Sequence, residues 1–288
     1  MSGNFPKIVV ILGPTASGKT DLGLALAKQF NGEIISADSR QVYKKMNIGT
    51  AKPVGEWVKD EYIVDGIIHH VMYIVEPNKD FSLADFKVMT TDCIGGILSR
   101  GKLPIVVGGT GLYIWTIVDN LDIPATKPNL DLRNDLEKKS LLELVAMLKS
   151  KDPESAEKID LKNPRRVLRA LEVVISSGQS FFEQRTKSEP LYNVLQIGIE
   201  VNKEELNNRI DNRVDKQIKD GLVEETRNLV DLGFGWDLPS MSGIGYKQVG
   251  YYLRGEMSLV EAIDMLKRDT KRFAKRQTTW FKRDKRIA

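Results

Sequence analysis

The sequence predicts an α/β fold: a core built on a parallel β-sheet, a mostly α-helical insertion and a basic helical C-terminus. Three observations lead to this prediction. Short apolar runs alternate with amphipathic segments over residues 1–118, which is typical of βαβ units. Residues 119–188 lose that alternation and are rich in charge at helical spacing. Ten of the last 22 residues are lysine or arginine.

Each element of the core has a local signal. The predicted strands are apolar, β-branched runs that end at glycine or a polar turn, and they cover residues 7–13, 33–37, 102–113 and 192–201. Helices are expected over 20–30 and 82–100, and the second begins with Ser82 and Asp85 at capping-box spacing. The residues between 38 and 81 are expected to be irregular. Alternating strands and helices imply parallel strands with right-handed crossovers.

The composition bounds the class of protein. The chain has 288 residues, 41% apolar and 28% charged, with a formal net charge of +4. No apolar run approaches the roughly 20 residues that span a bilayer, and the first residues lack a signal-peptide pattern. The single cysteine, Cys93, excludes an internal disulfide and a cysteine zinc site. We therefore expect a cytoplasmic protein without membrane contact, and a monomer because no segment indicates an obligate interface.

A phosphate-binding loop follows the first strand. The stretch GPTASGKT matches the P-loop pattern G-x-x-x-x-G-K-[ST] and consists of Gly13, Pro14, Thr15, Ala16, Ser17, Gly18, Lys19 and Thr20. Its glycines allow successive backbone amides to surround an anion, and the following helix adds its positive end. Lys19 supplies a charge, and the Thr20 hydroxyl can ligate Mg²⁺. The motif predicts a diphosphate site in a P-loop core but does not identify the compound.

The third predicted strand argues against a motor ATPase. A Walker B element is an apolar strand that ends in a carboxylate and helps to hold Mg²⁺. Here the corresponding run, IVVGG, ends in glycines. This leaves enzymes that transfer a group to or from a small phosphorylated compound.

Asp38 is the first catalytic candidate. It follows the second strand, at the edge where open α/β sheets bind ligands. A carboxylate there can orient an acceptor or take its proton, but it can also simply cap a turn that starts at Ser39. Thr110, in GGTGLY after the third strand, offers a hydroxyl at the same edge, although that motif alone is weak.

Basic residues gather on two predicted helices. The C-terminal helix carries three lysines and three arginines at intervals of four, which together predict one continuous cationic face: Lys267, Lys271, Lys275, Arg268, Arg272 and Arg276. In the insertion, Arg165, Arg166 and Arg169 share a helical face. Two separate basic faces suit a polyanion such as RNA. A solvated charged helix, with Trp280 and Phe281 in the core, is the alternative for the C-terminus.

Seven stretches together resemble the tRNA dimethylallyltransferases, also called tRNA isopentenyltransferases. They are GPTASGKT, ADSRQVYKKMNIGTAKP, GGTGLY, RRVLRALEV, GLVEETRNL, GIGYKQ and KRFAKRQTTWF, in the order of the family and over nearly the whole chain. The second is the most specific, because P-loop kinases lack it. No cysteine–histidine cluster follows at the C-terminus, so the chain resembles the bacterial type.

The resemblance implies a reaction. The dimethylallyl group of dimethylallyl diphosphate would pass to the exocyclic N6 of adenosine 37, next to the anticodon, in tRNAs reading codons that begin with U. The base would leave the stack of the anticodon loop to reach a channel. Mg²⁺ is the implied cofactor, and the anticodon stem-loop of tRNA is the implied partner. Residues 1–118 and 189–288 would form the P-loop core domain, and residues 119–188 a helical insertion that contacts tRNA.

The resemblance also implies roles for single residues. Lys19, the loop amides and a Thr20-bound Mg²⁺ would hold the diphosphate and neutralise the charge that it gains on leaving. Arg213 matches the arginine that clamps this diphosphate. Asp38 would accept a hydrogen bond from N6–H and act as the base while the nitrogen attacks in line.

The implied tRNA contacts form a larger set. They are Asp38, Ser39, Arg40, Gln41 and Thr110 at the channel, Arg165, Arg166, Val167, Leu168 and Arg169 in the insertion, and Ser242, Gly243, Ile244, Gly245, Tyr246, Lys247, Lys271 and Lys275 near the C-terminus. Ser242 stands where some relatives have arginine, which puts one RNA contact in question. His69 and His70 are expected to be structural and are assigned no role.

Two other functions stay open. A small-molecule or nucleoside kinase using ATP would share the P-loop and the carboxylate after the second strand, but it would not need two basic helices. A nonenzymatic RNA-binding protein would not need to keep Lys19, Asp38 and Arg213.

Overall fold

The computed structural model describes residues 5–123, 129–183 and 187–288. The chain divides into two units, Met1–Val118 with Leu191–Ala288, and Asp119–Pro190. The insertion expected over 119–188 lies within the second unit. Its residues 124–128 and 184–186 lie outside the described residues, as do residues 1–4, on which the signal-peptide expectation partly depended.

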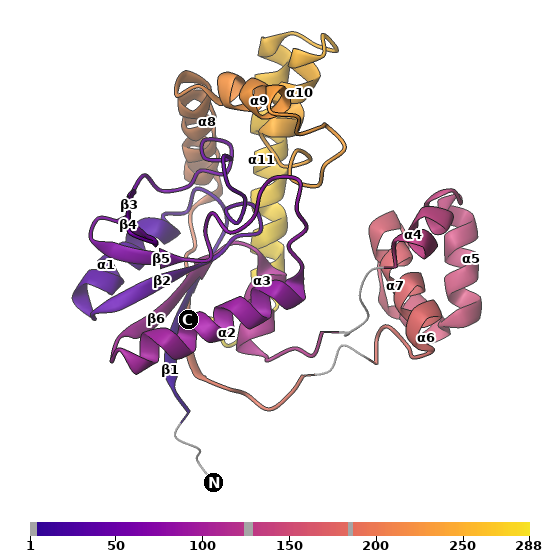
Figure 1. Cartoon of the computed structure of the whole chain (residues 1–288), viewed down its shortest axis with the longest axis horizontal. Helices are drawn as coiled ribbons and strands as arrows, with labels where there is room; N and C mark the ends of the chain where they lie inside the picture. The colour runs from indigo at the N-terminus through magenta and orange to yellow at the C-terminus, as the bar shows by residue number, and fades with distance from the viewer. Residues whose placement is uncertain (1–4, 124–128, 184–186) are drawn as a thin grey trace. The chain divides into compact units, whose positions relative to one another are not determined.

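A seven-stranded sheet forms the centre of the first unit, in the order β3-β4-β5-β2-β6-β1-β7 (Figure 1). The strands are β1 Lys7–Leu12, β2 Gly32–Ala37, β3 Glu56–Val58, β4 Glu61–Val64, β5 Ile67–His70, β6 Leu103–Gly108 and β7 Asn193–Gly198. The five strands from β5 to β7 pair in parallel, and the four of them that were predicted are β1, β2, β6 and β7. The carboxyl ends of β1, β2 and β6 therefore meet at one edge of the sheet.

The prediction was wrong for residues 56–70, which were expected to be irregular. They form β3, β4 and β5, and the pairs β3–β4 and β4–β5 are antiparallel, so the sheet is mixed rather than wholly parallel. Each of these strands has only three or four residues, too few for a period of two to stand out in the sequence.

Helices cover both faces of this sheet. They are α1 Lys19–Gln29, α2 Leu83–Ser99, α3 Gly111–Val118, α8 Lys203–Lys219, α9 Leu222–Asp231, α10 Tyr246–Leu253 and α11 Leu259–Phe281. α1 packs Ala27 against Ile34 and Val107 on one face. α2 packs Phe86 and Ile94 near Ile35 on the other. The predicted capping box of Ser82 and Asp85 is confirmed at the start of α2.

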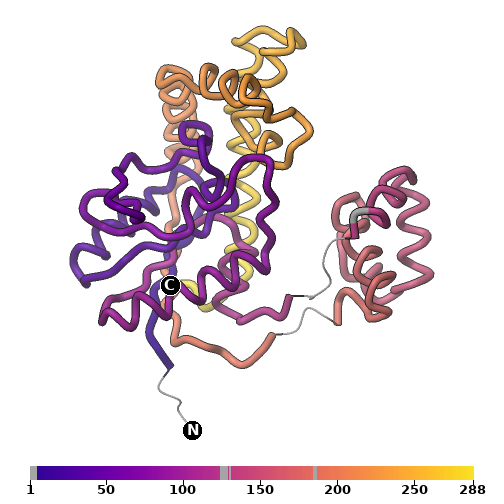
Figure 2. The backbone as a smooth tube through the Cα atoms, in the orientation of Figure 1, coloured from indigo at the N-terminus to yellow at the C-terminus, as the bar shows by residue number. Residues whose placement is uncertain are grey.

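Figure 2 traces how the chain leaves this unit after α3 and returns to it at β7 before building α8 to α11. The buried faces of these last helices join the same hydrophobic core as α2 and α3, through Leu222, Tyr246 and Phe281 among others. Among the described helices, none combines the length and apolar character that a membrane span requires.

The described part of the second unit is mostly helical, and an isolated β-bridge joins Leu121 to Lys187 near its two ends. Its helices are α4 Leu130–Glu137, α5 Leu141–Lys151, α6 Pro153–Lys158 and α7 Pro164–Ser177. Leu148, Val167 and Leu171 lie in a hydrophobic core of its own. The fully buried Glu172 accepts hydrogen bonds from Arg133 and Arg169, which satisfies its charge inside that core. The insertion is therefore stabilised by its own packing.

Candidate active site

A cavity of about 150 Å³ lies at the carboxyl edge of the central strands. Its walls come from the P-loop and the first turn of α1, from β2 and β6 where they end, from residues 50–53, from β5 and from Arg213 on α8. The position is the one expected for a ligand site in an open α/β sheet. Segments far apart in the sequence thus converge on one cavity.

The P-loop has the backbone shape of an anion nest. Ala16 has a φ of 63° and Gly18 a φ of 92°, and the chain then enters α1 at Lys19. The Ser17 hydroxyl is buried at the cavity and has no hydrogen-bond partner among the described residues. A buried hydroxyl of this kind is costly unless a ligand satisfies it. Both observations favour phosphate oxygens as the ligand.

Lys19 is a cation held inside this loop. Its Nζ donates to the Pro14 carbonyl at 2.6 Å. Burial lowers the pKa of Lys19 to about 8; the carboxylate of Asp38 opposes this shift and the guanidinium of Arg213 adds to it. An anion bound in the cavity would favour the protonated form.

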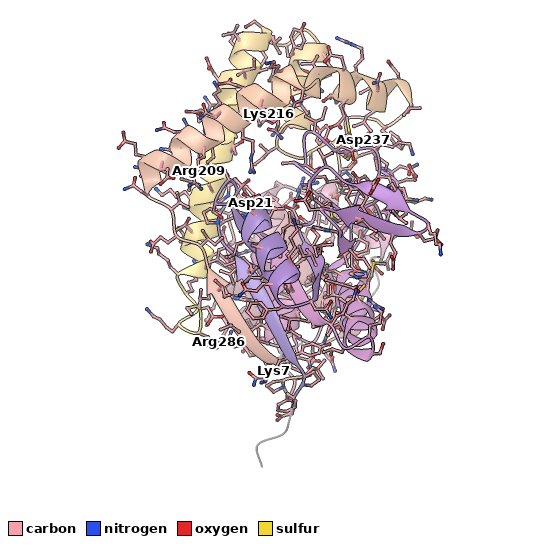
Figure 3. The ribbon with its side chains drawn as sticks, turned by 90° about the vertical axis from the view of Figure 1, so that its left-hand side faces the viewer. Lys7, Asp21, Arg209, Lys216, Asp237 and Arg286 are labelled. Carbon is pink, nitrogen blue, oxygen red and sulfur yellow. The ribbon has the colours of Figure 1, made fainter. Side chains whose placement is uncertain are left out.

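Arg213 reaches the loop from α8. Its Nη1 donates to the Thr15 hydroxyl at 3.2 Å, and its side chain lines the cavity. Burial lowers its pKa, and the carboxylate of Asp21 opposes that effect. Figure 3 shows Asp21 on α1, below the helix that carries Arg209 and Lys216. Two cations therefore face the P-loop side of the cavity.

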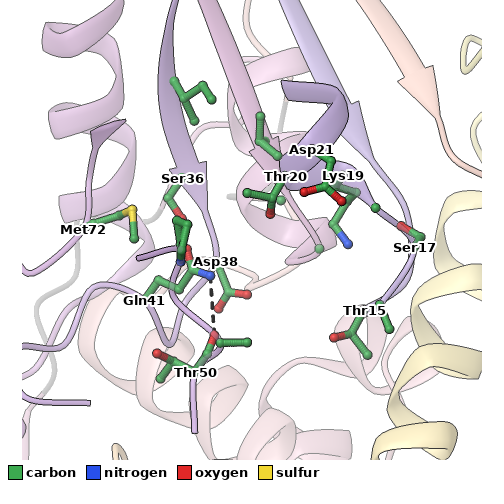
Figure 4. Close-up of a pocket in the computed structure, with 18 of the residues that line it drawn as sticks. Thr15, Ser17, Lys19, Thr20, Asp21, Ser36, Asp38, Gln41, Thr50 and Met72 are labelled. Atoms are coloured by element: carbon green, nitrogen blue, oxygen red, sulfur yellow. Dashed lines mark hydrogen bonds between the residues drawn. The ribbon is translucent and has the colours of Figure 1, made fainter. Parts of the chain in front are cut away.

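Asp38 lies on the opposite side of the cavity. In Figure 4 its carboxylate and the ammonium of Lys19 point toward one another. Its Oδ1 accepts from the backbone N–H of Arg40 at 2.8 Å, and Oδ2 accepts no hydrogen bond from the described residues. The two interpretations of Asp38 are therefore compatible. Oδ1 caps the turn, and Oδ2 is available to a ligand in the cavity.

The predicted residues nearest Asp38 are tied to one another. The Thr110 hydroxyl accepts from the backbone N–H of Ser39 at 3.1 Å. Gln41 accepts from the Ser36 hydroxyl at 2.9 Å and donates to the Thr50 carbonyl at 3.4 Å. The structure thus brings the channel residues of the predicted set together around Asp38.

The stretch from Ser242 to Lys247 approaches the same side. Arg40 Nη1 and the Ser242 hydroxyl both donate to the Pro239 carbonyl, each at 2.6 Å. Gly243 and Gly245 are buried, Ile244 packs against the core, and Lys247 is exposed. Tyr246 is fully buried, so its side chain is not available to RNA.

The predicted continuous cationic face of α11 is wrong. Lys267 and Lys271 pair with Asp215 and Asp211 of α8, each at 2.7 Å, and only Lys275 of the three lysines has no ion pair within the described ranges. Periodicity placed the lysines correctly on one face, but that face packs on an acidic neighbour. Phe281 is buried and Trp280 half-buried against Trp115, as in the alternative interpretation.

In the insertion, the residues of α7 that were predicted to contact tRNA lie partly on the surface and partly in the hydrophobic core. Arg165 and Arg166 are exposed and make no ion pair among the described residues. Arg169 pairs with Glu172, while the side chains of Val167 and Leu168 are buried in the hydrophobic core. The prediction of contacts by those two side chains is therefore wrong.

Sequence reasoning missed Gln277 on α11. Its Oε1 accepts from the Thr15 backbone N–H at 2.8 Å, and its Nε2 donates to the Gly109 carbonyl at 2.9 Å. A Cβ at Gly109 would lie 2.3 Å from that Nε2, so a side chain at this position would displace the amide. This amide therefore joins the P-loop to the turn before Thr110. Its only signal was its place in KRFAKRQTTWF.

The two histidines that were expected to be structural lie in different surroundings, and the sequence did not single out the nearby Lys52. His69 lines the cavity, its Nδ1 lies 3.0 Å from the Ile67 carbonyl, and burial lowers its pKa. His70 instead pairs with the buried Glu33 at 2.6 Å, a structural contact. Lys52 donates to the Tyr43 carbonyl, and burial lowers its pKa to about 7, opposed by Glu225 and Asp38.

No cluster of three or more histidine, cysteine, aspartate or glutamate side chains able to hold a metal occurs in the described part of the chain. The cavity does bring together the Thr20 hydroxyl and the carboxylates of Asp21 and Asp38. Mg²⁺ is commonly held by one or two protein groups together with phosphate oxygens and water. The side chains present therefore suit a magnesium ion that arrives with a phosphorylated substrate.

Comparison with known proteins identifies relatives over most of the chain. The family model described as IPP transferase matches residues 41–284, which begin just after Asp38. The tRNA dimethylallyltransferase of Acetivibrio thermocellus is 47% identical over 283 residues, covering 96% of this chain and 88% of that protein. The enzyme of the same name from Heliobacterium modesticaldum is 44% identical over 286 residues, covering 97% and 88%.

Solved structures agree with these relatives. The full-length tRNA isopentenylpyrophosphate transferase of Bacillus halodurans matches with a TM-score of 0.71 and 40% identity, over 98% of this chain and 88% of that one. A eukaryotic dimethylallyltransferase described as acting on tRNA matches with a TM-score of 0.80 and 30% identity. The match covers 96% of this chain and 69% of that one. The chain therefore belongs to the IPP transferase family and is a prenyltransferase of the tRNA dimethylallyltransferase type.

Proposed function

We propose that the protein transfers the dimethylallyl group of dimethylallyl diphosphate to the exocyclic N6 of adenosine 37, next to the anticodon, in tRNAs reading codons that begin with U. The observation that carries the proposal is a cavity with a phosphate-binding loop on one side and the Asp38 carboxylate on the other (Figure 4). Relatives named tRNA dimethylallyltransferase support the choice of donor and acceptor.

The donor half of the site consists of the P-loop, Lys19 and Arg213. Backbone amides and these two cations would hold the diphosphate before and after the C1–O bond breaks. The Thr20 hydroxyl lines the cavity and would ligate a Mg²⁺ ion bound together with the diphosphate. That ion, when bound, would help to neutralise the negative charge of the leaving diphosphate. Partial burial strengthens each of these interactions, because the effective dielectric constant is low.

The acceptor half of the site consists of Asp38 and the residues around it, chiefly Gln41 and Thr50. The lone pair on N6 forms the new bond to C1, the C1–O bond pair leaves with the diphosphate, and a proton passes from N6 to Asp38. The N–H of Arg40 fixes Oδ1 of Asp38 and leaves Oδ2 for the amine. An ionised carboxylate is sufficient as the base, because the amine becomes strongly acidic as the C–N bond forms.

Exposed cations on each of the two units would hold the RNA. Arg165 and Arg166 on the insertion, with Lys247 and Lys275 on the core, are exposed and fit contacts to phosphate. Lys271 would contribute less, because Asp211 already neutralises it. The helical insertion is thereby assigned to tRNA binding. In this proposal, a single copy of the chain acts on tRNA in the cytoplasm.

One assay tests the proposal. The protein is incubated with an unmodified tRNA transcript, Mg²⁺ and either labelled dimethylallyl diphosphate or γ-labelled ATP. We expect label from the allyl donor in the tRNA and no phosphate transfer from ATP to the tRNA or to a panel of nucleosides. Phosphate transfer from ATP without any allyl transfer would instead establish a kinase and overturn the proposal.

A further inference from the structure

We propose that Glu225 is a positioning residue for the acceptor half of the site: it holds residues 47–49, and through them the wall formed by Thr50 and Gln41. This inference rests on the proposed function, because it assigns the wall beside Asp38 to the acceptor. Glu225 lies on α9 and does not line the cavity itself.

One carboxylate makes four hydrogen bonds at this place. Glu225 Oε2 accepts from the backbone N–H groups of Asn47 and Ile48, both at 2.9 Å. Oε1 accepts from the N–H of Gly49 at 3.0 Å and from the Tyr246 hydroxyl at 2.6 Å. Three consecutive amides that converge in this way form an anion nest. Here the anion is a side chain of the protein itself, about 180 positions further along the chain.

The segment held by Glu225 continues directly into the cavity. Thr50 and Ala51 line the cavity, and the Thr50 carbonyl accepts from Gln41 Nε2. Figure 4 shows this Gln41–Thr50 contact beside the Asp38 carboxylate. Gln217 of α8 donates to the Ile48 carbonyl at 2.6 Å, which fixes the same segment from a second helix. The position of the wall thus depends on contacts made outside the cavity.

The packing of Gly49 against Tyr246 is a second, independent observation that residues 47–49 are held in place. A Cβ built on Gly49 would lie 2.5 Å from the ring of Tyr246, so the buried ring lies directly against the backbone of the segment. Burial, with the Glu225 carboxylate, raises the pKa of Tyr246 well above its usual value, so its hydroxyl stays protonated and donates. Sterics and hydrogen bonds therefore fix residues 47–49 against α9 and α10.

The tests use Glu225→Gln as the principal variant. The amide keeps the shape of the side chain but replaces one accepting oxygen with a donor that faces backbone N–H groups. Glu224→Gln is the matched control, because Glu224 is the neighbouring glutamate on α9 and is exposed. Its only ion pair among the described residues is a long one, with Oε1 3.9 Å from Nη1 of the exposed Arg227. Tyr246→Phe removes the hydroxyl that donates to Glu225 but keeps the buried ring and the Glu225 carboxylate, so it provides a milder variant if Glu225→Gln folds poorly.

Three quantities are measured for each variant: steady-state transfer to tRNA, affinity for inorganic pyrophosphate, and hydrogen exchange at the amides of residues 47–49. In Glu225→Gln we expect kcat/KM for tRNA to fall at least about tenfold, with a loss of about threefold in Tyr246→Phe. Pyrophosphate affinity should stay within about twofold of wild type, since the P-loop is untouched. Exchange at residues 47–49 should accelerate, and Glu224→Gln should match wild type.

Normal tRNA transfer by Glu225→Gln, with faster exchange at residues 47–49, would overturn the inference. An equal loss of pyrophosphate binding would also overturn it, because it would show a general loss of structure. Tyr246→Phe is judged by the same criteria. Failure of the proposed function is a different result, in which wild type itself transfers no allyl group to tRNA.

Discussion

The two halves of the cavity are built in different ways. The donor half is mainly one continuous stretch, Gly13 to Thr20, that leaves β1 and enters α1. The acceptor half combines Asp38 and Gln41 after β2 with Thr50, and it depends on hydrogen bonds from α8, α9 and α10. A short motif can therefore specify a phosphate site, whereas the neighbouring wall exists only after the tertiary fold has formed.

The largest effect should come from a substitution of Asp38, which disables the acceptor half and leaves the donor half intact. Asp38→Asn keeps the turn hydrogen bond to Arg40 but removes the base, and we expect the single-turnover rate to fall about 10³-fold. Affinity for inorganic pyrophosphate should be unchanged, because the donor half is intact. Asp60→Asn, at an exposed position between β3 and β4, serves as the control. A variant at Asp38 with nearly normal rate would contradict its role as base.

Arg213→Gln should damage the donor half of the site and leave the acceptor half intact. Loss of a half-buried guanidinium beside Thr15 should weaken pyrophosphate binding about 100-fold and leave tRNA affinity intact. Arg209→Gln, four residues earlier on α8 and exposed, is the matched control. Titration calorimetry with each ligand measures both affinities. Equal weakening of tRNA and pyrophosphate binding would show that the two halves are not separable.

Lys19 gives the donor half a pH dependence. Its pKa of about 8 lies below the ordinary value, and a bound anion stabilises the charged form and raises that pKa. Binding above pH 8 therefore takes up a proton at Lys19, so the contribution of Lys19 to pyrophosphate affinity should be flat below pH 8 and fall up to about tenfold per unit above it. Lys19→Arg keeps its charge throughout and reports the titration of the ligand itself. Identical pH profiles for the two proteins would reject this assignment.

The smallest effects should distinguish the two basic helices. Arg165→Gln combined with Arg166→Gln removes two exposed charges, and the slope of log K for tRNA against log salt should fall by about 2. Lys271→Gln should change the slope much less, because that lysine is paired with Asp211. Affinities measured across a salt series give the slopes. A larger effect at Lys271 would mean that tRNA displaces the pair.

What the sequence could predict follows the same division. The P-loop, the helix after it and the Ser82 capping box depend on neighbours within a few residues, and the structure has all three. The short strands β3 to β5 carry no comparable local signal and were missed. Charge periodicity placed Lys271 on the right face of α11 but could not reveal Asp211 on α8.

The candidate site shows the same limit. Asp38 could be proposed from its place after a strand, and Arg213 from the family resemblance alone. Gln277 and Glu225 stand inside two of the family stretches, but nothing local reveals their contacts, since Thr15 lies 262 positions from Gln277 and the three amides lie 176 to 178 positions from Glu225. Tyr246 was predicted to contact RNA, yet its side chain is buried and bonded to Glu225. A motif marks a segment as important without showing which of its side chains face the ligand.

The central claim is that a diphosphate leaving group and a single adenine amine meet across this cavity. The most direct test maps the label after one turnover with allyl-labelled donor, on a tRNA transcript and on the same transcript with guanosine in place of adenosine 37. We predict label on N6 of that adenosine and none on the substituted transcript. Equal label on both transcripts, or label on another nucleotide, would contradict the account.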